Sequence, residues 1–304
     1  MISVIIPVKN GGADLTRCLD AIRSQRVDGV IEIVVVDSGS SDDSVANARA
    51  RGAVVHEIPP AAFSHGASRN LGARSAGGEF LVFISQDAYP VADDWLKRLL
   101  APMRSGARVG GVYGRQLAHA GASPPEIYFL NFLYGSEPRR QRVQRPDQLS
   151  METTLFSNVN AAMPKPIFER FPFVEDIVMS EDQEWSRRVL LAGFEIEYEP
   201  AAAVRHSHNY TLTAAFRRFF DSGASASRAY LAGGRESSNV LRRAAIDYAR
   251  GEFRWLRRTG QARWIPYAAL YEATKMAGLI AGANHEHLPL QTKRRLSALP
   301  SFWE

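Results

Sequence analysis

The sequence predicts an α/β fold, a mostly parallel sheet flanked by helices, followed by a helical C-terminal region. Two observations predict it. Short apolar runs rich in β-branched residues alternate with amphipathic stretches over residues 3–85, whereas after residue 210 Ala, Arg, Leu and aromatic residues dominate. Alternating strands and helices form parallel strands joined by right-handed crossovers, and uninterrupted apolar runs indicate strands that are covered on both faces.

The expected elements follow one another in a regular order. Strands are expected at residues 3–8, 31–36, 53–57 and 79–85, with helices at 14–25, 43–51 and 65–76. Ser41 or Asp42 is a suitable N-cap for the second of these helices. Further along, we expect a strand at 158–163, a helix at 180–192 that ends at Gly193, and a strand at 195–199. Residues 114–154 are expected to form loops around a substrate site.

The chain divides into two parts of opposite charge. Residues 205–304 carry sixteen Lys and Arg against seven Asp and Glu, whereas residues 1–204 carry 21 basic and 25 acidic residues. We assign residues 1–210 to a catalytic domain and 211–304 to a basic helical region. A basic region of this kind suits a polyanionic surface, and charge alone leaves an anionic membrane leaflet and a nucleic acid both open.

The stretch 264–283 is apolar enough to be considered as a membrane span. Glu272 and Lys275 lie near its middle, where a charged group is costly in a bilayer. We therefore expect an amphipathic helix that either packs on the body of the protein or lies in the membrane interface.

Composition and the N-terminus indicate a folded protein of a reducing compartment. Hydrophobic residues make up 45% of the chain and charged residues 23%, which is typical of globular proteins. The lone Cys18 lies on the apolar face of a helix and excludes an intramolecular disulfide framework. The first residues have neither a basic segment nor a cleavage site, so we expect a cytoplasmic protein.

Polar residues follow the apolar strands at the points where ligands bind in open parallel sheets. They are Lys9-Asn10, Asp37, His56-Glu57 and Gln86-Asp87, and their strand ends should converge on one cleft. Asp37 can accept hydrogen bonds from a ribose hydroxyl or a base N–H, or it can hold a turn. Asp87 suits Mg²⁺ or Mn²⁺, which proteins hold with one or two carboxylates together with substrate phosphates.

Two helix starts carry further charged residues. Arg69 can reach a diphosphate beside a helix N-terminus, or it can be a solvated charge. Glu181, Asp182 and Glu184 open a helix beside Trp185, and the helix dipole accounts for only one or two of these acids. We expect Asp182 to deprotonate an incoming hydroxyl and Trp185 to form a platform for a sugar ring.

Two histidines follow the strand expected at 195–199. His206 and His208 would point to opposite sides of an extended chain, so we do not expect them to bind one ion together. Either can complete a metal site, contact a phosphate or be purely structural.

In their order and spacing, these motifs resemble glycosyltransferase family 2, a family of inverting enzymes with the GT-A fold. The matching segments are Val-Ile-Ile-Pro-Val-Lys-Asn at 4–10, Ile-Val-Val-Val-Asp-Ser-Gly-Ser-Ser-Asp at 33–42, Arg-Asn-Leu-Gly-Ala at 69–73, Phe-Ile-Ser-Gln-Asp-Ala at 83–88 and Glu-Asp at 181–182. The resemblance covers about residues 1–210. Segments 65–70, 85–88 and 181–185 are similar to the rhamnosyltransferase branch, which builds O-antigens and capsules and implies dTDP-L-rhamnose as the donor.

The resemblance also implies roles for individual residues. The donor would be bound by Pro7, Lys9, Asn10, Asp37, Arg69, Gln86, Asp87 and His206, and the acceptor by Glu181 and Trp185. Asp182 would be the general base of a single inverting displacement. Ser85 stands where the family has the first of two metal-binding aspartates, which leaves Asp87 to hold Mg²⁺ or Mn²⁺. The saccharide acceptor would be lipid-linked, with the enzyme in peripheral contact with the anionic inner face of the plasma membrane.

Three other functions compete with this interpretation. A family 2 transferase can use a UDP-sugar instead. A nucleotidyltransferase would need a basic, Gly-rich phosphate loop after the first strand, and residues 9–12 resemble one only faintly. A nucleic-acid-binding module would use Phe253, Trp255 and Trp264 near Arg257 and Arg258, but it leaves the acidic cleft unexplained, so no nucleic acid is expected.

Overall fold

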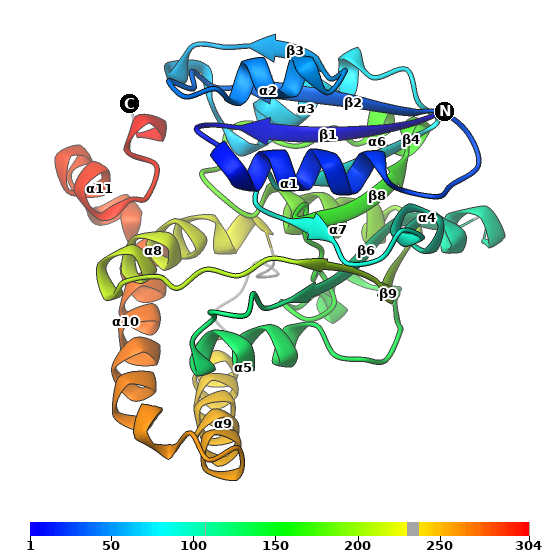
Figure 1. Cartoon of the computed structure of the whole chain (residues 1–304). Coiled ribbons are helices and arrows are strands. Elements are labelled where there is room, and N and C mark those ends of the chain that lie inside the picture. The colour runs from blue at the N-terminus through cyan, green and yellow to red at the C-terminus, as the bar shows by residue number, and fades with distance from the viewer. Residues whose placement is uncertain (107, 230–236, 304) are drawn as a thin grey trace.

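The computed structural model describes residues 1–106, 108–229 and 237–303, and within them the chain forms the predicted α/β fold (Figure 1). The strands are β1 (Ile2–Val8), β2 (Ile31–Asp37), β3 (Val54–Glu57), β4 (Phe80–Ile84), β5 (Tyr89–Pro90), β6 (Val109–Leu117), β7 (Arg139–Gln141), β8 (Asn160–Pro164) and β9 (Glu195–Arg205). The helices are α1 (Gly12–Arg23), α2 (Ser44–Ala50), α3 (His65–Ser75), α4 (Trp95–Ser105), α5 (Pro124–Leu133), α6 (Lys165–Arg170), α7 (Glu181–Leu191), α8 (Leu212–Ala229), α9 (Ser237–Arg258), α10 (Ile265–Ala283) and α11 (Leu290–Leu296).

The sheet is mixed, with a parallel first half. Its order is β3-β2-β1-β4-β8-β6-β9-β5, with β7 beside β9. β3, β2, β1 and β4 are parallel, as the alternating pattern predicts, whereas β8 is antiparallel to both β4 and β6. Because Asn160 pairs with Ile84, the segment that leads into β8 arrives at the edge where β1, β2 and β4 end. The carboxyl ends of β6 and β9 reach this edge as well.

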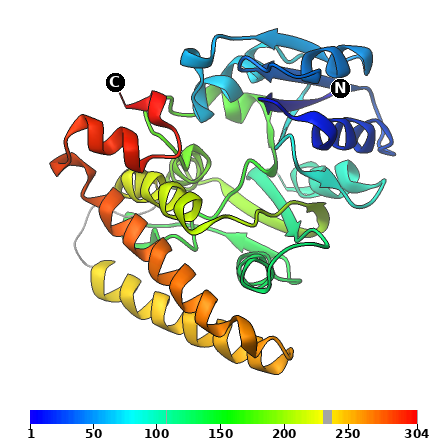
Figure 2. The same cartoon turned by 60° about the vertical axis from the view of Figure 1, so that its left-hand side comes forward.

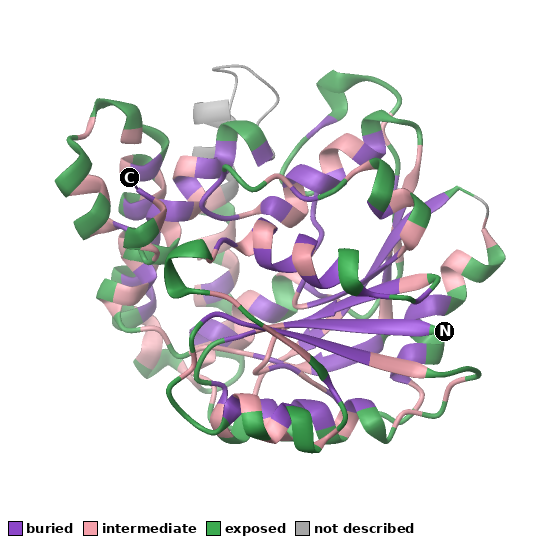
Figure 3. Cartoon of the chain, turned by 90° about the horizontal axis from the view of Figure 1, so that it is seen from above, coloured by how far each residue is buried: buried purple, intermediate pink, exposed green. Residues whose placement is uncertain are grey.

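Helices cover both faces of the sheet, and alternate residues of β1 enter different cores. Val4 and Ile6 pack with Leu15 of α1 and Trp95 of α4. Ile5 belongs to the opposite core, which is built largely by α3, α6 and α7. The central strands are therefore buried along most of their length (Figure 3). This two-sided burial is what the uninterrupted apolar runs predict.

The segment 114–154 is more regular than the sequence suggests. Gly110 and Gly111 weaken the sequence pattern of a strand at the start of β6, because glycine is a weak strand former. A Cβ on Gly111 would lie 2.8 Å from the Trp185 ring, so the glycines let α7 pack closely on the strand. Pro124 and Pro125 occupy the first positions of α5, where a missing N–H costs nothing.

Helices dominate the described part of residues 211–303; residues 230–236 and Glu304 of the predicted region lie outside the described residues. α8 and α10 cross closely, because a Cβ on Gly282 would meet the Phe220 carbonyl oxygen at 1.9 Å. Figure 2 shows α9 and α10 extending together away from the sheet. α10 thus packs on α8, and no helix among the described residues has the length and apolarity required to cross a bilayer.

Candidate active site

The first part of the site lies where β1 and β4 end. Gln86 clamps the β1 turn with two hydrogen bonds, accepting from the Lys9 N–H at 2.9 Å and donating to the Lys9 carbonyl at 3.1 Å. Asn10 has a left-handed φ of 49° and accepts from the Ser41 N–H at 2.8 Å through Oδ1. Pro7, half-buried, pairs with Val36 in the strand just before this turn. The structure thus brings Lys9, Asn10 and Gln86 together at this edge of the sheet, with Pro7 in the strand before them.

Asp37 lies at the same edge but is only 2% exposed. Its Oδ1 accepts from the N–H groups of Gly39 and Ser40, both at 2.9 Å, and its Oδ2 accepts from the Ser40 hydroxyl. Of the two roles expected for Asp37, the structure therefore displays that of a turn residue, which holds the backbone of residues 37–40 beside the β1 turn.

A potential metal site is formed by Asp87, His206 and His208. His206 Nε2 lies 3.7 Å from Asp87 Oδ1, and His208 Nε2 lies 3.5 Å from Asp87 Oδ2. One ligand atom from each residue falls within 4.8 Å of the other two. The expectation that the two histidines point to opposite sides is wrong, because β9 ends at Arg205 and residues 206–208 are not a strand. Their rings instead make a T-shaped contact at 4.6 Å.

A buried amide orients His206. Gln116, at the end of β6, donates from Nε2 to the Tyr134 and Ser157 hydroxyls at 2.8 and 3.0 Å. Its Oε1 is left to accept from His206 Nδ1 at 2.9 Å. The Nε2 lone pair of His206 then faces Asp87, an arrangement typical of metal-ligating histidines. Burial lowers the pKa of His206 well below its usual value, which keeps the ring neutral.

Asp182 lies in the first turn of α7 and is half-buried. Its Oδ2 accepts from the Asn158 N–H at 3.1 Å, and its Oδ1 from the Gln183 N–H at 2.9 Å. Burial, together with the neighbouring Glu181 charge, raises the pKa of Asp182 to about 7. A carboxylate with this pKa suits general base catalysis near neutral pH.

Glu181 has a different environment from its neighbour. Its Oε1 accepts from Arg69 Nη1 at 2.9 Å and from Asn158 Nδ2 at 3.1 Å. Although burial opposes ionisation, Arg69 and the other partners lower the pKa of Glu181. Two adjacent carboxyl groups are thus separated in pKa, one fixed as an anion and the other able to exchange a proton near pH 7.

The structure revises the roles expected for three residues. Arg69 and Glu181 form an ion pair with side chains 8% and 6% exposed, so neither is available to a diphosphate or an acceptor in this conformation. The pair joins the first half of α3 to the first residue of α7, while α3 packs along β1 and β2. Trp185 is fully buried against Phe156 and Phe173, so the prediction that it forms a sugar platform is wrong.

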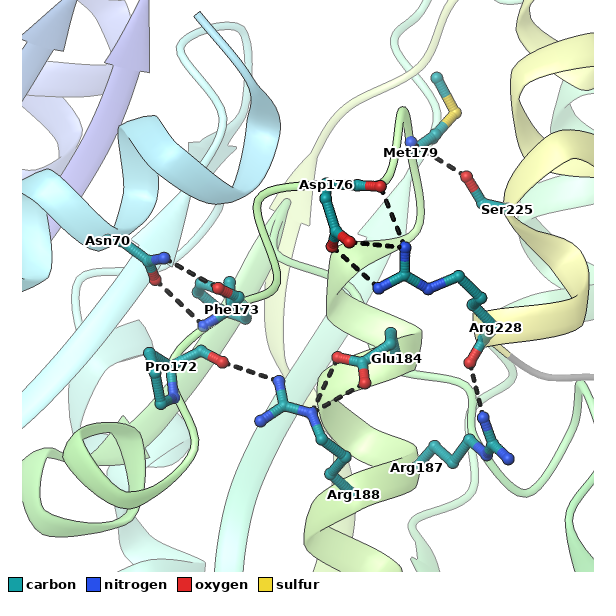
Figure 4. Close-up of polar contacts among 10 residues, drawn as sticks. All are labelled: Asn70, Pro172, Phe173, Asp176, Met179, Glu184, Arg187, Arg188, Ser225 and Arg228. Atoms are coloured by element: carbon teal, nitrogen blue, oxygen red, sulfur yellow. Dashed lines mark hydrogen bonds and ion pairs between the residues drawn. The ribbon is translucent and has the colours of Figure 1, made fainter. Parts of the chain in front are cut away.

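The loop before α7 is fastened to α3, to α8 and, through Arg188 and the Pro172 carbonyl, to α7 itself, as Figure 4 shows. Asn70 of α3 makes two hydrogen bonds with the Phe173 backbone at 2.8 and 3.0 Å. On α8, Arg228 pairs with Asp176 at 2.8 Å, and Ser225 accepts from the Met179 N–H at 3.2 Å. The loop ends at Ser180, whose left-handed φ of 65° turns the chain into α7. These contacts fix the position of Glu181 and Asp182.

Several functional candidates were not identified from the sequence. Gln116 is a polar residue within an apolar strand, a signal that was available but not used. Arg218 of α8 is exposed and lies over the Tyr210 ring at 5.9 Å, and Tyr210 in turn contacts the His208 ring at 5.0 Å. The Arg218 charge adds to the effect of burial in lowering the pKa of His208. No sequence pattern distinguishes Arg218 from its neighbour Arg217.

Comparisons with known proteins identify the family of this chain. The family model described as glycosyl transferase family 2 matches residues 3–171. The chain is 31% identical to the O-antigen chain rhamnosyltransferase RfbN of Salmonella typhimurium, over 99% of this chain and 96% of the relative. It is also 31% identical to the O-antigen chain rhamnosyltransferase WbaN of Salmonella anatum, over 99% and 95%.

A solved structure supports the fold. The mannosyltransferase PcManGT of Pyrobaculum calidifontis, in complex with GDP-Man and Mn²⁺, superposes with a TM-score of 0.63 at 18% identity. The alignment covers 94% of this chain and 88% of that one. The predicted GT-A fold is confirmed.

Proposed function

This chain belongs to glycosyltransferase family 2 and is a glycosyltransferase, and on that premise we propose that it transfers L-rhamnose from dTDP-L-rhamnose to a saccharide acceptor in O-antigen synthesis. The observation that carries the proposal is the 31% identity with two O-antigen chain rhamnosyltransferases over nearly the whole chain. The geometry of the site supports the proposal, because it offers a candidate base for the acceptor and a candidate group of residues for the leaving diphosphate.

Asp182 is the proposed general base. It is half-buried, and with a pKa of about 7 a large fraction of it is ionised at neutral pH. Asp182 takes the proton of an acceptor hydroxyl as that oxygen bonds to the anomeric carbon. The bond from this carbon to the diphosphate breaks, and the electron pair leaves with the nucleoside diphosphate. A single displacement from the opposite face inverts the anomeric configuration.

Asp87, His206 and His208 are the proposed ligands of a divalent cation. A carboxylate with two imidazoles fits Mn²⁺ better than Mg²⁺, which prefers oxygen donors. PcManGT, named as a complex with Mn²⁺, has the same fold. A cation there supplies Lewis-acid neutralisation of the diphosphate charge. Gln116 keeps His206 in the orientation and tautomer that a ligand requires.

The leaving diphosphate also needs a cationic side chain from the protein. Arg69 is paired with Glu181, so we assign this role to Arg218, which is exposed and reaches over Tyr210 toward the histidines. A guanidinium suits a diphosphate because it can donate two parallel hydrogen bonds. On the nucleoside side, the turn held by Asp37 joins the Lys9 and Asn10 backbone as the proposed pocket wall.

The α9–α10 turn is the proposed contact with the membrane. Arg254, Arg257, Arg258 and Arg263 are all exposed there, and Tyr267 and Leu270 expose aromatic and apolar surface on the following turns of α10. Basic residues beside exposed apolar side chains suit an anionic lipid surface. We propose that the enzyme meets a lipid-linked acceptor at the inner face of the plasma membrane.

The first test is calorimetric titration with dTDP and with UDP, each with and without Mn²⁺. The proposal expects dTDP to bind more tightly than UDP, with an enhancement by Mn²⁺ that disappears in Asp87→Ala. A preference for UDP would retain the family and contradict the rhamnose donor. Incubation with dTDP-L-rhamnose and acceptor, followed by NMR of the product linkage, then tests inversion, and a retained configuration contradicts the single displacement.

A further inference from the structure

A cavity beside the proposed metal site takes no part in the proposed reaction. It has a volume of about 460 Å³ and lies between the loop before α5, the segment that follows β9, and α10. Its lining residues are Gly121, Ala122, Ser123, Pro124, Asn209, Tyr210, Thr211, Trp264, Tyr267 and Tyr271. This volume is in the range of small-molecule binding sites.

The aromatic pocket, as we name the cavity lined by these residues, adjoins the proposed catalytic centre through a shared side chain. Tyr210 forms part of its wall, and the Tyr210 ring lies 5.0 Å from that of His208. His208 Nε2 lies 3.5 Å from Asp87 Oδ2. A ligand in the aromatic pocket is therefore separated from the proposed cation ligands by one layer of side chains.

The chemistry of the lining selects a neutral ligand. The lining set includes no Asp, Glu, Lys, Arg or His, so an ionic partner for a phosphate or another charged group is missing from it. Four aromatic side chains supply flat surfaces, and Tyr267 stacks on Tyr271 at 5.8 Å with an interplanar angle of 20°. Within the described residues, no hydrogen bond engages the hydroxyls of Ser123, Tyr210, Tyr267 or Tyr271.

Flat aromatic surfaces together with available hydroxyls suit a sugar ring, whose C–H face stacks while its hydroxyls form hydrogen bonds. Asn209 makes the wall rigid, because it accepts from the Ser123 N–H and donates to the Gly121 carbonyl, both at 2.8 Å. We propose that the aromatic pocket binds a non-reacting sugar unit of the acceptor and so sets acceptor specificity. This inference rests on the proposed function.

Two further observations favour the acceptor as the source of that sugar. The family model ends at residue 171, whereas Asn209, Trp264 and Tyr267 lie beyond it, in sequence that the alignments with RfbN and WbaN cover. The rim formed by Trp264 and Tyr267 also adjoins Arg263 at the proposed membrane contact. A lipid-linked saccharide would reach the aromatic pocket from that side.

Binding without turnover is the first test. Saturation-transfer NMR of the full chain uses methyl glycosides of rhamnose, mannose, galactose and glucose, with farnesol as a neutral isoprenoid probe. At least one glycoside should give a signal that Tyr267→Ala and Trp264→Ala abolish and that Leu270→Ala retains. Leu270 is a matched control because it is exposed on the same helix and does not line the pocket. A signal from farnesol alone, or glycoside signals unchanged in both pocket variants, would overturn the proposal.

Turnover gives a second test that separates this inference from the proposed function. Tyr267→Ala should raise the KM for a lipid-free saccharide acceptor, assayed without membranes, by about ten-fold, the effect of losing one aromatic contact. Hydrolysis of dTDP-L-rhamnose and the Kd of dTDP should not change. If wild-type protein neither binds nor hydrolyses this donor, the proposed function fails while the NMR result still stands. Equal acceptor KM values in Tyr267→Ala and wild type would contradict the pocket assignment.

Discussion

Replacement of Asp182 by Asn should make the protein more stable at pH 8 while it removes activity. Asp182 is held in the folded state with a pKa raised from 3.8 to about 7, mainly by burial. Its ionisation at neutral pH therefore opposes folding. The free energy of unfolding is therefore highest below the unfolded pKa of Asp182 and falls as the pH rises from about 4 to 7, because the folded state binds the proton more tightly than the unfolded state does. Asn cannot ionise, so Asp182→Asn should lose this pH dependence.

The size of this stability change follows from the pKa shift of Asp182 and from the two hydrogen bonds that its carboxylate accepts. A shift of about three pKa units corresponds to about 4 kcal/mol of free energy of unfolding at full effect. The partial exposure of the side chain reduces this value. Asn also has one carboxamide oxygen for the two N–H groups of Asn158 and Gln183, and losing one hydrogen bond costs about 1 kcal/mol. We expect Asp182→Asn to gain about 1–2 kcal/mol at pH 8 and to lose about 1 kcal/mol at pH 4.

Urea unfolding of wild type and Asp182→Asn at pH 4, 6 and 8 measures this difference. Asp28→Asn is the control, since it removes the same charge from an exposed loop. Activity should fall by about 10²–10⁴-fold, the usual contribution of a general base, and wild-type kcat/KM should rise through an apparent pKa near 7. A stability difference that does not vary between pH 4 and pH 8 would refute burial as the cause of the shift. Unimpaired turnover in Asp182→Asn would refute the assignment of the base.

Three further predictions concern the leaving-group side and the helical region. His206→Ala and His208→Ala should each weaken Mn²⁺ binding, and Gln116→Leu should weaken it about 10–100-fold because the His206 ring is no longer held in place. Calorimetric titration with Mn²⁺ measures these affinities. If His208→Ala binds Mn²⁺ as tightly as wild type, His208 is not a ligand. Arg218→Ala should raise the dTDP Kd about ten-fold or more with unchanged stability, whereas Arg217→Ala, a substitution of its exposed neighbour, should leave the dTDP Kd unchanged. Arg69→Ala should instead lower the free energy of unfolding by about 3–5 kcal/mol, because Glu181 is left buried without its partner. If Arg69→Ala weakens dTDP binding and Arg218→Ala does not, Arg69 is again the diphosphate ligand. Replacing Arg257, Arg258 and Arg263 by Gln should abolish cosedimentation with vesicles that contain phosphatidylglycerol, and retention of binding would place the membrane contact elsewhere.

The positions of the proposed donor residues were predictable because they depend on strand ends. Lys9, Asp37 and Gln86 directly follow apolar runs, and the topology of an open parallel sheet brings such positions to one edge whatever the loops do. The proposal of Asp182 has a related origin, since three acids in one helical turn exceed what a helix dipole requires. Both inferences need only the positions of helices and strands along the sequence, and no knowledge of how they pack.

The remaining residues required knowledge of packing. Trp185 follows Asp182 by three positions, yet its ring points into the core, because the glycines of β6 leave space for it. Arg69 is buried in an ion pair with Glu181, which lies 112 residues later in the chain, so its own sequence neighbourhood gives no sign that it is not a solvent-exposed arginine. His208 joins Asp87 because β9 ends at Arg205, and a difference of a few residues at a strand end decides whether two histidines face one ion or opposite sides.

α8 connects the two halves of the proposed site. Near its start, Arg218 lies over Tyr210 beside the histidines. Near its end, Ser225 and Arg228 hold the backbone of Met179 and the side chain of Asp176, in the loop that leads to Asp182. A continuous helix transmits displacement along its axis with little loss, because its hydrogen bonds and its packing against α10 resist bending. If a diphosphate draws Arg218 inward and α8 moves with it, we expect the same movement to reach the loop before α7 and so to link donor binding to the position of Asp182.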